Sequence, residues 1–309
     1  MKLRWIIPLL ICLATLVAPA QQQQEQKKAE DDQEVISVET NQVVLNVTVT
    51  DALEKYVSGL KRTDFRIFED KQPQRIVGFK FEENPFAAAI LLDASGSMEQ
   101  KMTLVRAACG SFIEGIREGD NFAIYSFTGT KVKQLQPFSE VRDMSDFIWD
   151  MRADGMTPMY DAIVKASEDL AQRPEKRRAI LLVSDGADST SRASLDEAIR
   201  KASVASVMIY CVDLSDRGVF KTTPRDNGAE IMKTLALKTG GRFFSTPAGR
   251  QLRDAFTQAV DELRNQYTIT YEPTNEKKDG KWRTVEVTLA KPALSVRTRQ
   301  GYYAPKAKK

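Results

Sequence analysis

The 309-residue sequence contains no histidine. This absence excludes Ser-His-Asp and Cys-His catalysis, acid–base catalysis by an imidazole, and the zinc sites that many enzymes build from histidine. The side chains that remain as possible nucleophiles have no evident general base in the sequence. We therefore expect that the protein is not an enzyme.

Neither sign of charge is in large excess. The chain has 45 basic and 42 acidic residues, and two of the basic ones, Lys2 and Arg4, fall in a segment that we expect to be removed. A nearly neutral chain lacks the excess of basic residues that is typical of nucleic-acid-binding proteins. The sequence therefore predicts no nucleic-acid partner.

The N-terminus has the composition of a secretory signal. Lys2 and Arg4 precede an apolar run over residues 5–17, and residues 18–20 supply the small side chains of a signal peptidase site. We expect residues 1–20 to be cleaved and the protein to be exported, to the periplasm or the exterior of a bacterium, with no stable membrane span left. A retained membrane anchor is the alternative, although the apolar run is short for a bilayer.

Cysteine is scarce, with three residues in the chain. Cys12 falls in the expected signal, which leaves Cys109 on a predicted helix and Cys211 in an apolar run at residues 207–212. We expect both to be buried free thiols, because a free cysteine behaves as a small apolar side chain. A disulfide, which export permits, is the alternative.

Strand patterns occupy both ends of the mature chain. They follow residues 21–34, which are rich in Gln, Lys, Glu and Asp and are expected to form a disordered linker. Residues 35–84 and 266–303 contain β-branched or alternating runs at 43–49, 64–69, 75–81, 267–271, 284–289 and 294–298. Neither segment has enough strands for a stable sheet of its own. We expect them to pair into one β-sandwich, with separate small sheets as the alternative and residues 304–309 as a basic tail.

The middle of the chain, residues 85–265, alternates apolar strand patterns with helical periods. This order is typical of an α/β fold with a doubly wound, mostly parallel sheet. Strands are predicted at residues 87–92, 122–127, 131–135, 179–184, 207–213 and 242–245, and helices at 102–117, 141–151, 159–171, 195–205, 229–238 and 250–264. Ligands of such sheets bind beyond the carboxyl ends of the strands, where the strand order reverses.

Oxygen-bearing side chains follow two of these predicted strands. Asp93, Ser95 and Ser97 come directly after the apolar run 86–92, and Asp185 follows another predicted strand. Thr157 lies between them in sequence, in the loop Gly-Met-Thr-Pro. Carboxylates and hydroxyls suit a hard divalent ion such as magnesium, which keeps several waters when bound. We therefore interpret the two serines as ligands and not as nucleophiles.

This pattern resembles the von Willebrand factor A domain and its metal-ion-dependent adhesion site, whose signature is Asp-x-Ser-x-Ser, a distant Thr and a distant Asp. The resemblance implies a Rossmann-like domain with bound Mg²⁺ or Mn²⁺. It implies that Ser95, Ser97 and Thr157 coordinate the ion directly, whereas Asp93 and Asp185 hold coordinated waters. An ion with few direct carboxylates then accepts a further ligand from an Asp or Glu of a protein partner.

Other acidic residues lie near the motif in sequence. We expect their carboxylates to be solvated on loops or helices and to take no part in the site; they are Asp154, Asp161 and Asp188.

The flanking segments carry a second resemblance, to the von Willebrand A-related proteins described chiefly from acidobacteria. The matching stretches are residues 47–51, 57–60, 64–70 and 297–305, so the two resemblances together span nearly the whole mature chain. One departure is Asp70-Lys71, where relatives tend to place Gly after the Asp. This departure argues against a type I′ turn, although another turn type would serve.

Two function classes follow from these expectations. The first is an exported binding protein that holds a protein partner through its metal, with no turnover. The second is an accessory or assembly factor for a larger periplasmic complex, acting with an ATPase. An enzyme that uses Ser95 or Asp93 as a nucleophile near a metal is a weaker third class.

Overall fold

A computed structural model describes residues 42–81, 84–144, 146–186, 188–215, 227–245 and 250–307 of the chain. The predicted signal at residues 1–20, the linker at 21–34 and the first residues of the N-terminal β segment lie outside these ranges, as does Cys12.

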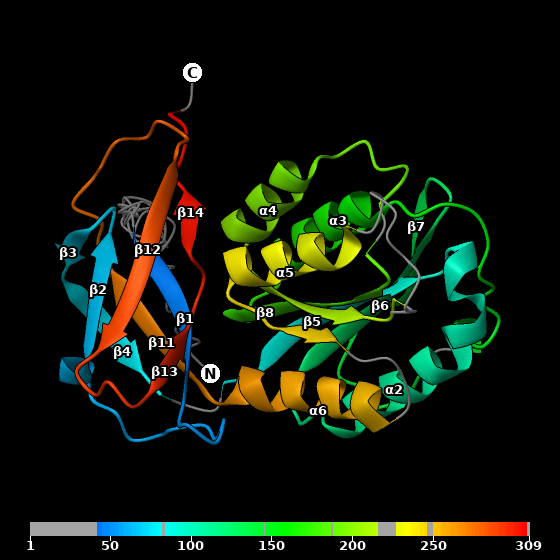
Figure 1. Ribbon diagram of the computed structural model, residues 1–309, viewed down its shortest axis with the longest axis horizontal. Coiled ribbons are helices and arrows are strands. Elements are labelled where there is room, and N and C mark those ends of the chain that lie inside the picture. Colours follow the sequence, from blue (N-terminus) through cyan, green and yellow to red (C-terminus); the bar gives the residue numbers. More distant parts are fainter. Residues whose placement is uncertain are drawn as a thin grey trace, which may run out of the picture. The chain divides into compact units, whose positions relative to one another are not determined.

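A six-stranded sheet forms the centre of the α/β part of the chain (Figure 1). All neighbouring strands pair in parallel except the last two, which are antiparallel. The order across the sheet is β10 (Phe243–Ser245), β9 (Val207–Asp213), β8 (Arg177–Ser184), β5 (Phe86–Asp93), β6 (Asn121–Thr128) and β7 (Lys131–Ser139). The predicted α/β fold is therefore confirmed, as a mixed sheet whose strand order reverses at β5.

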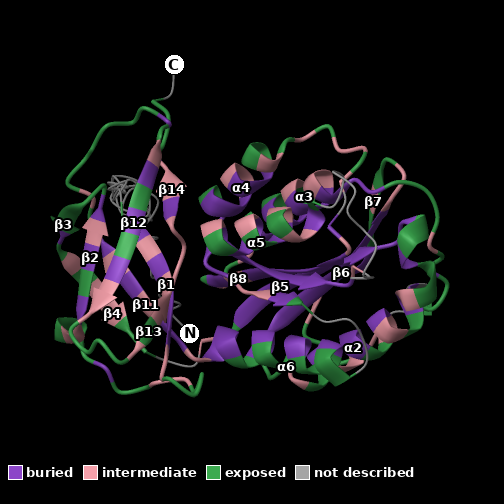
Figure 2. Cartoon of the chain, in the orientation of Figure 1, coloured by how far each residue is buried: buried purple, intermediate pink, exposed green. Residues whose placement is uncertain are grey.

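Helices cover both faces of this sheet (Figure 1). One face packs against α2 (Met102–Glu114) and α6 (Arg250–Arg264), and the other against α3 (Met159–Ala171), α4 (Leu195–Val204) and α5 (Gly228–Thr239). Successive residues of β5 alternate between the two apolar cores, and all of them are buried (Figure 2). A strand covered on both faces needs a continuous apolar run, and this strand has one in residues 86–92.

The strands outside the α/β part form two four-stranded sheets. The first has the order β13 (Ser295–Arg297), β1 (Val43–Thr50), β11 (Gln266–Tyr271) and β4 (Ile76–Lys80), and the second β14 (Gly301–Tyr303), β12 (Trp282–Leu289), β2 (Phe65–Glu69) and β3 (Gln72–Gln74). Each sheet combines N-terminal and C-terminal strands, because β1 pairs with β11 and β2 pairs with β12. Apolar side chains from both sheets share one cluster, which includes Val47, Ile67, Tyr267 and Val287.

The described part of the expected basic tail is bonded to the preceding loop. Ala304 N–H donates to Lys281 O at 2.9 Å, Gly280 N–H donates to Pro305 O at 3.2 Å, and Ala307 N–H donates to Lys278 O at 3.0 Å. Residues 304–307 are therefore held by the backbone of the loop between β11 and β12.

The turn between β2 and β3 differs from our expectation. Asp70 and Lys71 have φ angles of 47° and 68°, and Glu69 pairs with Gln72, so a two-residue hairpin has positive φ at both central positions, as a type I′ turn requires. The neighbouring strand stabilises this conformation, because Asp70 N–H donates to Thr284 O and Thr284 N–H donates to Asp70 Oδ1, both at 2.9 Å. Asp also tolerates the left-handed region better than most residues.

The helix predicted at residues 141–151 does not form in the part of this stretch that the structure describes, residues 141–144 and 146–151. These residues contain a short 3₁₀ turn, η3 (Asp146–Ile148). Polar side chains compete for the backbone: Ser139 Oγ accepts from Val141 N–H at 3.0 Å and Asp143 Oδ1 accepts from Met144 N–H at 2.8 Å. The guanidinium of Arg106 also donates hydrogen bonds to two backbone carbonyls of this segment, those of Ile148 and Met151.

Strand β7 continues four residues beyond its predicted end at residue 135. Pro137 lies within it, and the pairing with β6 shifts register there. An edge strand tolerates proline because only one side of it needs backbone donors. The remaining 3₁₀ turns are η1 (Arg62–Asp64) and η2 (Gly96–Lys101).

Cys109 and Cys211 are both buried free thiols, as predicted. Among the helices that the structure describes, none combines the length and the apolar composition needed to cross a membrane.

Candidate metal centre

Asp93 anchors the candidate site at the carboxyl end of β5. Its side chain is fully buried, and both oxygens accept hydrogen bonds: Oδ1 from Ser95 N–H at 2.9 Å and Oδ2 from the Ser184 hydroxyl at 2.5 Å. Ser184 ends the neighbouring parallel strand β8, so two strand ends meet here. The carboxylate is therefore fixed in one orientation.

The two motif serines lie side by side above this carboxylate. Ser95 has extended backbone angles and begins η2, which contains Ser97, and their hydroxyl oxygens are 3.1 Å apart. Ser95 is buried, whereas Ser97 is exposed. The hydroxyl pair therefore runs from the interior to the surface, which is the arrangement that an externally accessible ligand site needs.

A second loop brings Thr157 to the same end of the sheet. Asp154 N–H donates to Ala94 O at 2.8 Å, and Gly96 N–H donates to Gly155 O at 3.2 Å, so this loop is bonded to the serine motif. Two residues further on, Thr157 is buried. Its hydroxyl makes no hydrogen bond among the described residues. This hydroxyl is therefore available to a ligand.

A third loop, after β8, supplies Asp185 and holds Thr157. Ser189 donates its N–H to Thr157 O and accepts from Thr157 N–H through its hydroxyl, both at 2.9 Å. Asp185 is partly exposed, but its Oδ1 atom is buried and has no hydrogen-bond partner. A buried carboxylate oxygen without a donor is costly, so this position calls for a cation or an ordered water.

Asp185 also affects the titration of Asp93. Burial is the main reason that the pKa of Asp93 lies above its ordinary value, and the nearby charge of Asp185 raises it further. Two neighbouring carboxylates at one strand edge are the electrostatic environment that a bound cation stabilises.

The donor set fits a hard divalent ion. It consists of hydroxyls and two carboxylates, with no nitrogen or sulfur donor, and hard cations prefer such oxygen ligands. Among the described residues, no group of three or more His, Cys, Asp and Glu side chains could hold a metal. This finding is compatible with the candidate centre, because it offers only two acidic side chains.

Gly186 fixes the path of the chain just after Asp185. Its φ is +81°, and a Cβ atom at this position would lie 2.6 Å from the carbonyl carbon and oxygen of Gly228, at the start of α5. The loop that carries Asp185 therefore passes so close to α5 that only glycine fits.

The structure assigns roles to two serines that had none in the sequence. Ser184 orients Asp93, and Ser189 fixes Thr157. Ser184 directly precedes Asp185 at a strand end, and this position in the sequence could have predicted that its hydroxyl lies in the site. Ser189 has no comparable signal, because its contact depends on how the two loops fold together.

Two of the three nearby acidic residues are partly exposed and also bind neighbouring groups. Asp188 accepts hydrogen bonds from Tyr160 N–H and from the Ser191 hydroxyl, and Asp161 accepts from the backbone N–H groups of Arg192 and Ala193. These carboxylates shape the loop after β8. Asp154 is exposed, as predicted.

The family model described as von Willebrand factor type A domain matches residues 89–258. A von Willebrand factor type A structure from Catenulispora acidiphila has a TM-score of 0.50 and 13% identity, covering 87% of this chain and 75% of that chain. A comparison with curated proteins gives no match.

Two further solved structures are similar over a smaller part of the chain. One is an aerotolerance-related membrane protein from Bacteroides fragilis, with multiple mutations to serines (TM-score 0.46, 15% identity, 58% of this chain and 98% of that chain). The other is the vWF domain of a type V pili tip protein from Porphyromonas gingivalis (TM-score 0.47, 14% identity, 58% of this chain and 95% of that chain).

The family match contains β6 and β8, the last five residues of β5 and most of α6, and it includes every residue of the candidate centre. It extends over more than half of the sequence. The chain therefore belongs to the von Willebrand factor type A domain family.

Proposed function

We propose that this protein is an exported, non-enzymatic binding protein that holds a protein partner through a Mg²⁺ or Mn²⁺ ion, the partner supplying an Asp or Glu ligand. Membership of the von Willebrand factor type A family indicates a protein-binding or adhesion-type function. The observation that carries the finer proposal is the buried, unpartnered Oδ1 of Asp185 beside Asp93.

Five side chains would hold the ion. Ser95, Ser97 and Thr157 would offer hydroxyl oxygens directly, and Asp93 and Asp185 would bind its waters and balance its charge. A bound ion of this kind supplies a Lewis acid that attracts an external carboxylate. Ser97 is exposed, so the partner's carboxylate would approach from its side of the site.

The serine geometry favours binding over turnover. The Ser95 hydroxyl lies against the Ser97 hydroxyl, and the Asp93 oxygens are occupied by Ser95 N–H and the Ser184 hydroxyl. A nucleophile needs a base within hydrogen-bond reach, and the sequence contains no imidazole to act as one.

We also interpret the two four-stranded sheets as a β-sandwich built from residues 35–84 and 266–303, which flanks the binding domain. The shared apolar cluster and the pairing of β1 with β11 support this interpretation.

The first test is whether the candidate centre binds the ion. Magnesium at a hundredfold excess over its Kd should stabilise the fold by about 2.7 kcal/mol. Ser97→Ala should remove most of this shift at little cost to the metal-free protein, because Ser97 is exposed. Thr63→Ala, at an exposed hydroxyl of the flanking segment, is the matched control. An unchanged magnesium response in both Ser97→Ala and Thr157→Ala would place the ion elsewhere.

The second test concerns the partner. Pull-down from an envelope extract should retain a protein in magnesium and lose it on chelation. The captured protein should also be lost with Ser97→Ala and retained with Thr63→Ala. Equal capture by all of these samples, with and without chelator, would show that this centre is not the contact surface.

A further inference from the structure

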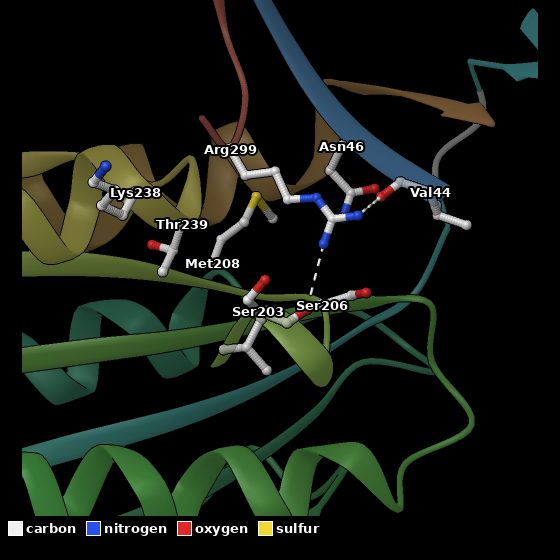
Figure 3. A pocket seen from close by; sticks show the side chains of 9 residues that line it. Val44, Asn46, Ser203, Ser206, Met208, Lys238, Thr239 and Arg299 are labelled. Atoms are coloured by element: carbon white, nitrogen blue, oxygen red, sulfur yellow. Dashed lines mark hydrogen bonds between the residues drawn. The ribbon is translucent and has the colours of Figure 1, made fainter. Parts of the chain in front are cut away.

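A small cavity lies between the first flanking sheet and the α/β sheet (Figure 3). Its volume, counted as space for the centre of a water-sized sphere, is about 20 Å³. Ser203 and Ser206 line it from the end of α4 and the turn after it, Lys238 from α5, Asn46 from β1, and Arg299 from the segment after β13. One water needs about 10–15 Å³ by this measure, so the cavity admits only a water or a small ion.

The guanidinium of Arg299 is buried beside this cavity without a counter-ion. Nη2 donates to Val44 O at 2.9 Å and Nη1 donates to Ser203 O at 3.3 Å, as the dashed lines in Figure 3 show. Nε is buried and has no partner. Part of the side chain reaches solvent, but none of the described residues places a carboxylate against the guanidinium.

Burial lowers the pKa of Arg299, and the nearby phenols of Tyr271 and Tyr302 only partly oppose this effect. A buried charge with neutral partners alone is costly, and proteins usually pair it with an opposite charge. The same chain does so two residues earlier, where Arg297 pairs with Glu262. Arg299 is therefore a partly buried positive charge beside this cavity, with no carboxylate partner among the described residues.

Two more unpartnered polar groups lie at the same cavity. Ser203 Oγ and Asn46 Oδ1 are both buried and have no hydrogen-bond partner. The Ser203 hydroxyl can donate a hydrogen bond, and so can the Asn46 amide when it is flipped, because its oxygen and nitrogen are assigned from hydrogen bonding. Lys238 adds a second cation to the lining.

The backbone of Arg299 packs closely against the end of α5. Gly240 ends α5 with φ +84°, and a Cβ atom there would lie 2.4 Å from Arg299 N. The C-terminal cap of α5 thus packs directly on the chain that carries Arg299.

We propose that this cavity binds a small monovalent anion of the size of chloride, held by Arg299 Nε–H and the Ser203 hydroxyl and attracted by Lys238. The anion would balance the buried guanidinium and link the first flanking sheet to α4 and α5. A volume of about 20 Å³ favours a monatomic anion over sulfate, phosphate or an organic carboxylate.

Thermal unfolding of the full chain tests this proposal, at fixed ionic strength and fixed magnesium, with sodium chloride replacing sodium gluconate. We expect a saturable rise in Tm of about 3 °C in chloride, and a similar rise in bromide. Crystals grown in bromide should show an anomalous peak within hydrogen-bond distance of Arg299 Nε and Ser203 Oγ.

Matched variants locate the effect. Ser203→Ala should reduce the chloride response, and Arg299→Met should abolish it. Ser167→Ala, which removes another buried and unpartnered hydroxyl on α3, should leave the response unchanged. A crystal with only water at this position, or an equal chloride response in Ser203→Ala and Ser167→Ala, would overturn the proposal even if Arg299→Met fails to fold.

Discussion

Single glycines decide whether the loop that carries Asp185 can form. We expect Gly186→Ala to lower the free energy of unfolding by at least about 2 kcal/mol, because φ is +81° and a Cβ atom would collide with Gly228 at 2.6 Å. Gly110→Ala is the contrasting control, since Gly110 lies inside α2 and a Cβ atom at this position would meet no atom within 4 Å. It should stabilise the protein by about 0.5–1 kcal/mol. Urea unfolding of both variants measures the difference, and equal effects would contradict this account.

The two buried thiols predict how stability changes at alkaline pH. Burial raises the pKa of Cys109 to about 12, and burial raises the pKa of Cys211 as well. A group whose pKa is raised by folding contributes its full stability below the unfolded pKa, near 9, and loses it as the pH rises toward the folded value. Each thiol should therefore cost about 1.4 kcal/mol of stability at pH 10.

Urea unfolding at pH 8 and pH 10 measures this loss, and Cys109→Ala should make it smaller. Both thiols should also resist a thiol reagent at pH 8 in the folded protein and react after denaturation. A rapid reaction of either thiol in the native state would show that this thiol is accessible to solvent and not buried.

At the scale of elements, α6 is tied to the flanking strands by one buried acid. Glu262 is fully buried on α6; it accepts hydrogen bonds from Thr48 on β1 and Tyr210 on β9, each at 3.2 Å, and pairs with Arg297 on β13. Four elements therefore meet at one carboxylate.

We expect Glu262→Gln to destabilise the fold by about 2–3 kcal/mol, because it leaves Arg297 without its partner. Arg297 keeps 31% of its side chain exposed, and solvent moderates the loss. Glu230→Gln, in the exposed pair with Lys233 on α5, should change stability by less than about 0.5 kcal/mol. Chemical unfolding of Glu262→Gln, of Arg297→Met and of the double variant measures the coupling between the two groups, with Glu230→Gln as the control. Simple additivity in that double variant would show that the two groups act independently.

At the scale of the whole molecule, each flanking sheet needs both ends of the chain. Strand β11 lies between β1 and β4, and β12 lies between β14 and β2. A chain that ends at Arg264 loses both central strands, so β1 has no partner left among the described strands and β2 keeps only its hairpin with β3. We expect this truncated protein to aggregate, because exposed strand edges pair with other chains.

A chain that ends at Ala304 is the control, since it keeps all the strands from β11 to β14. Size-exclusion chromatography and hydrogen exchange of residues 43–50 compare the two proteins. Full protection of these residues in the shorter chain would show that the N-terminal segment folds independently.

The local patterns in the sequence determined much of the α/β part. Continuous apolar runs predicted β5, β8 and β9 within two residues, because a strand covered on both faces needs apolar side chains at every position. Helical spacing located α3 and α6 at their observed bounds. The order Asp93, Ser95, Ser97, Thr157 and Asp185 identified the candidate centre, although its role in metal binding stays a prediction.

Other features depended on tertiary contacts. The stretch at residues 141–151 has helical spacing, but its polar side chains and Arg106 bind its backbone in another conformation. Asp70 and Lys71 form an unexpected turn because Thr284, more than 200 residues away, binds Asp70. Ser189 and the cavity at Arg299 had no sequence signal, since each requires segments distant in sequence to meet. The hydrophobic periodicity of the sequence predicts which side chains are buried. Which buried polar groups bind one another depends on tertiary packing, because it brings together residues that are distant in sequence.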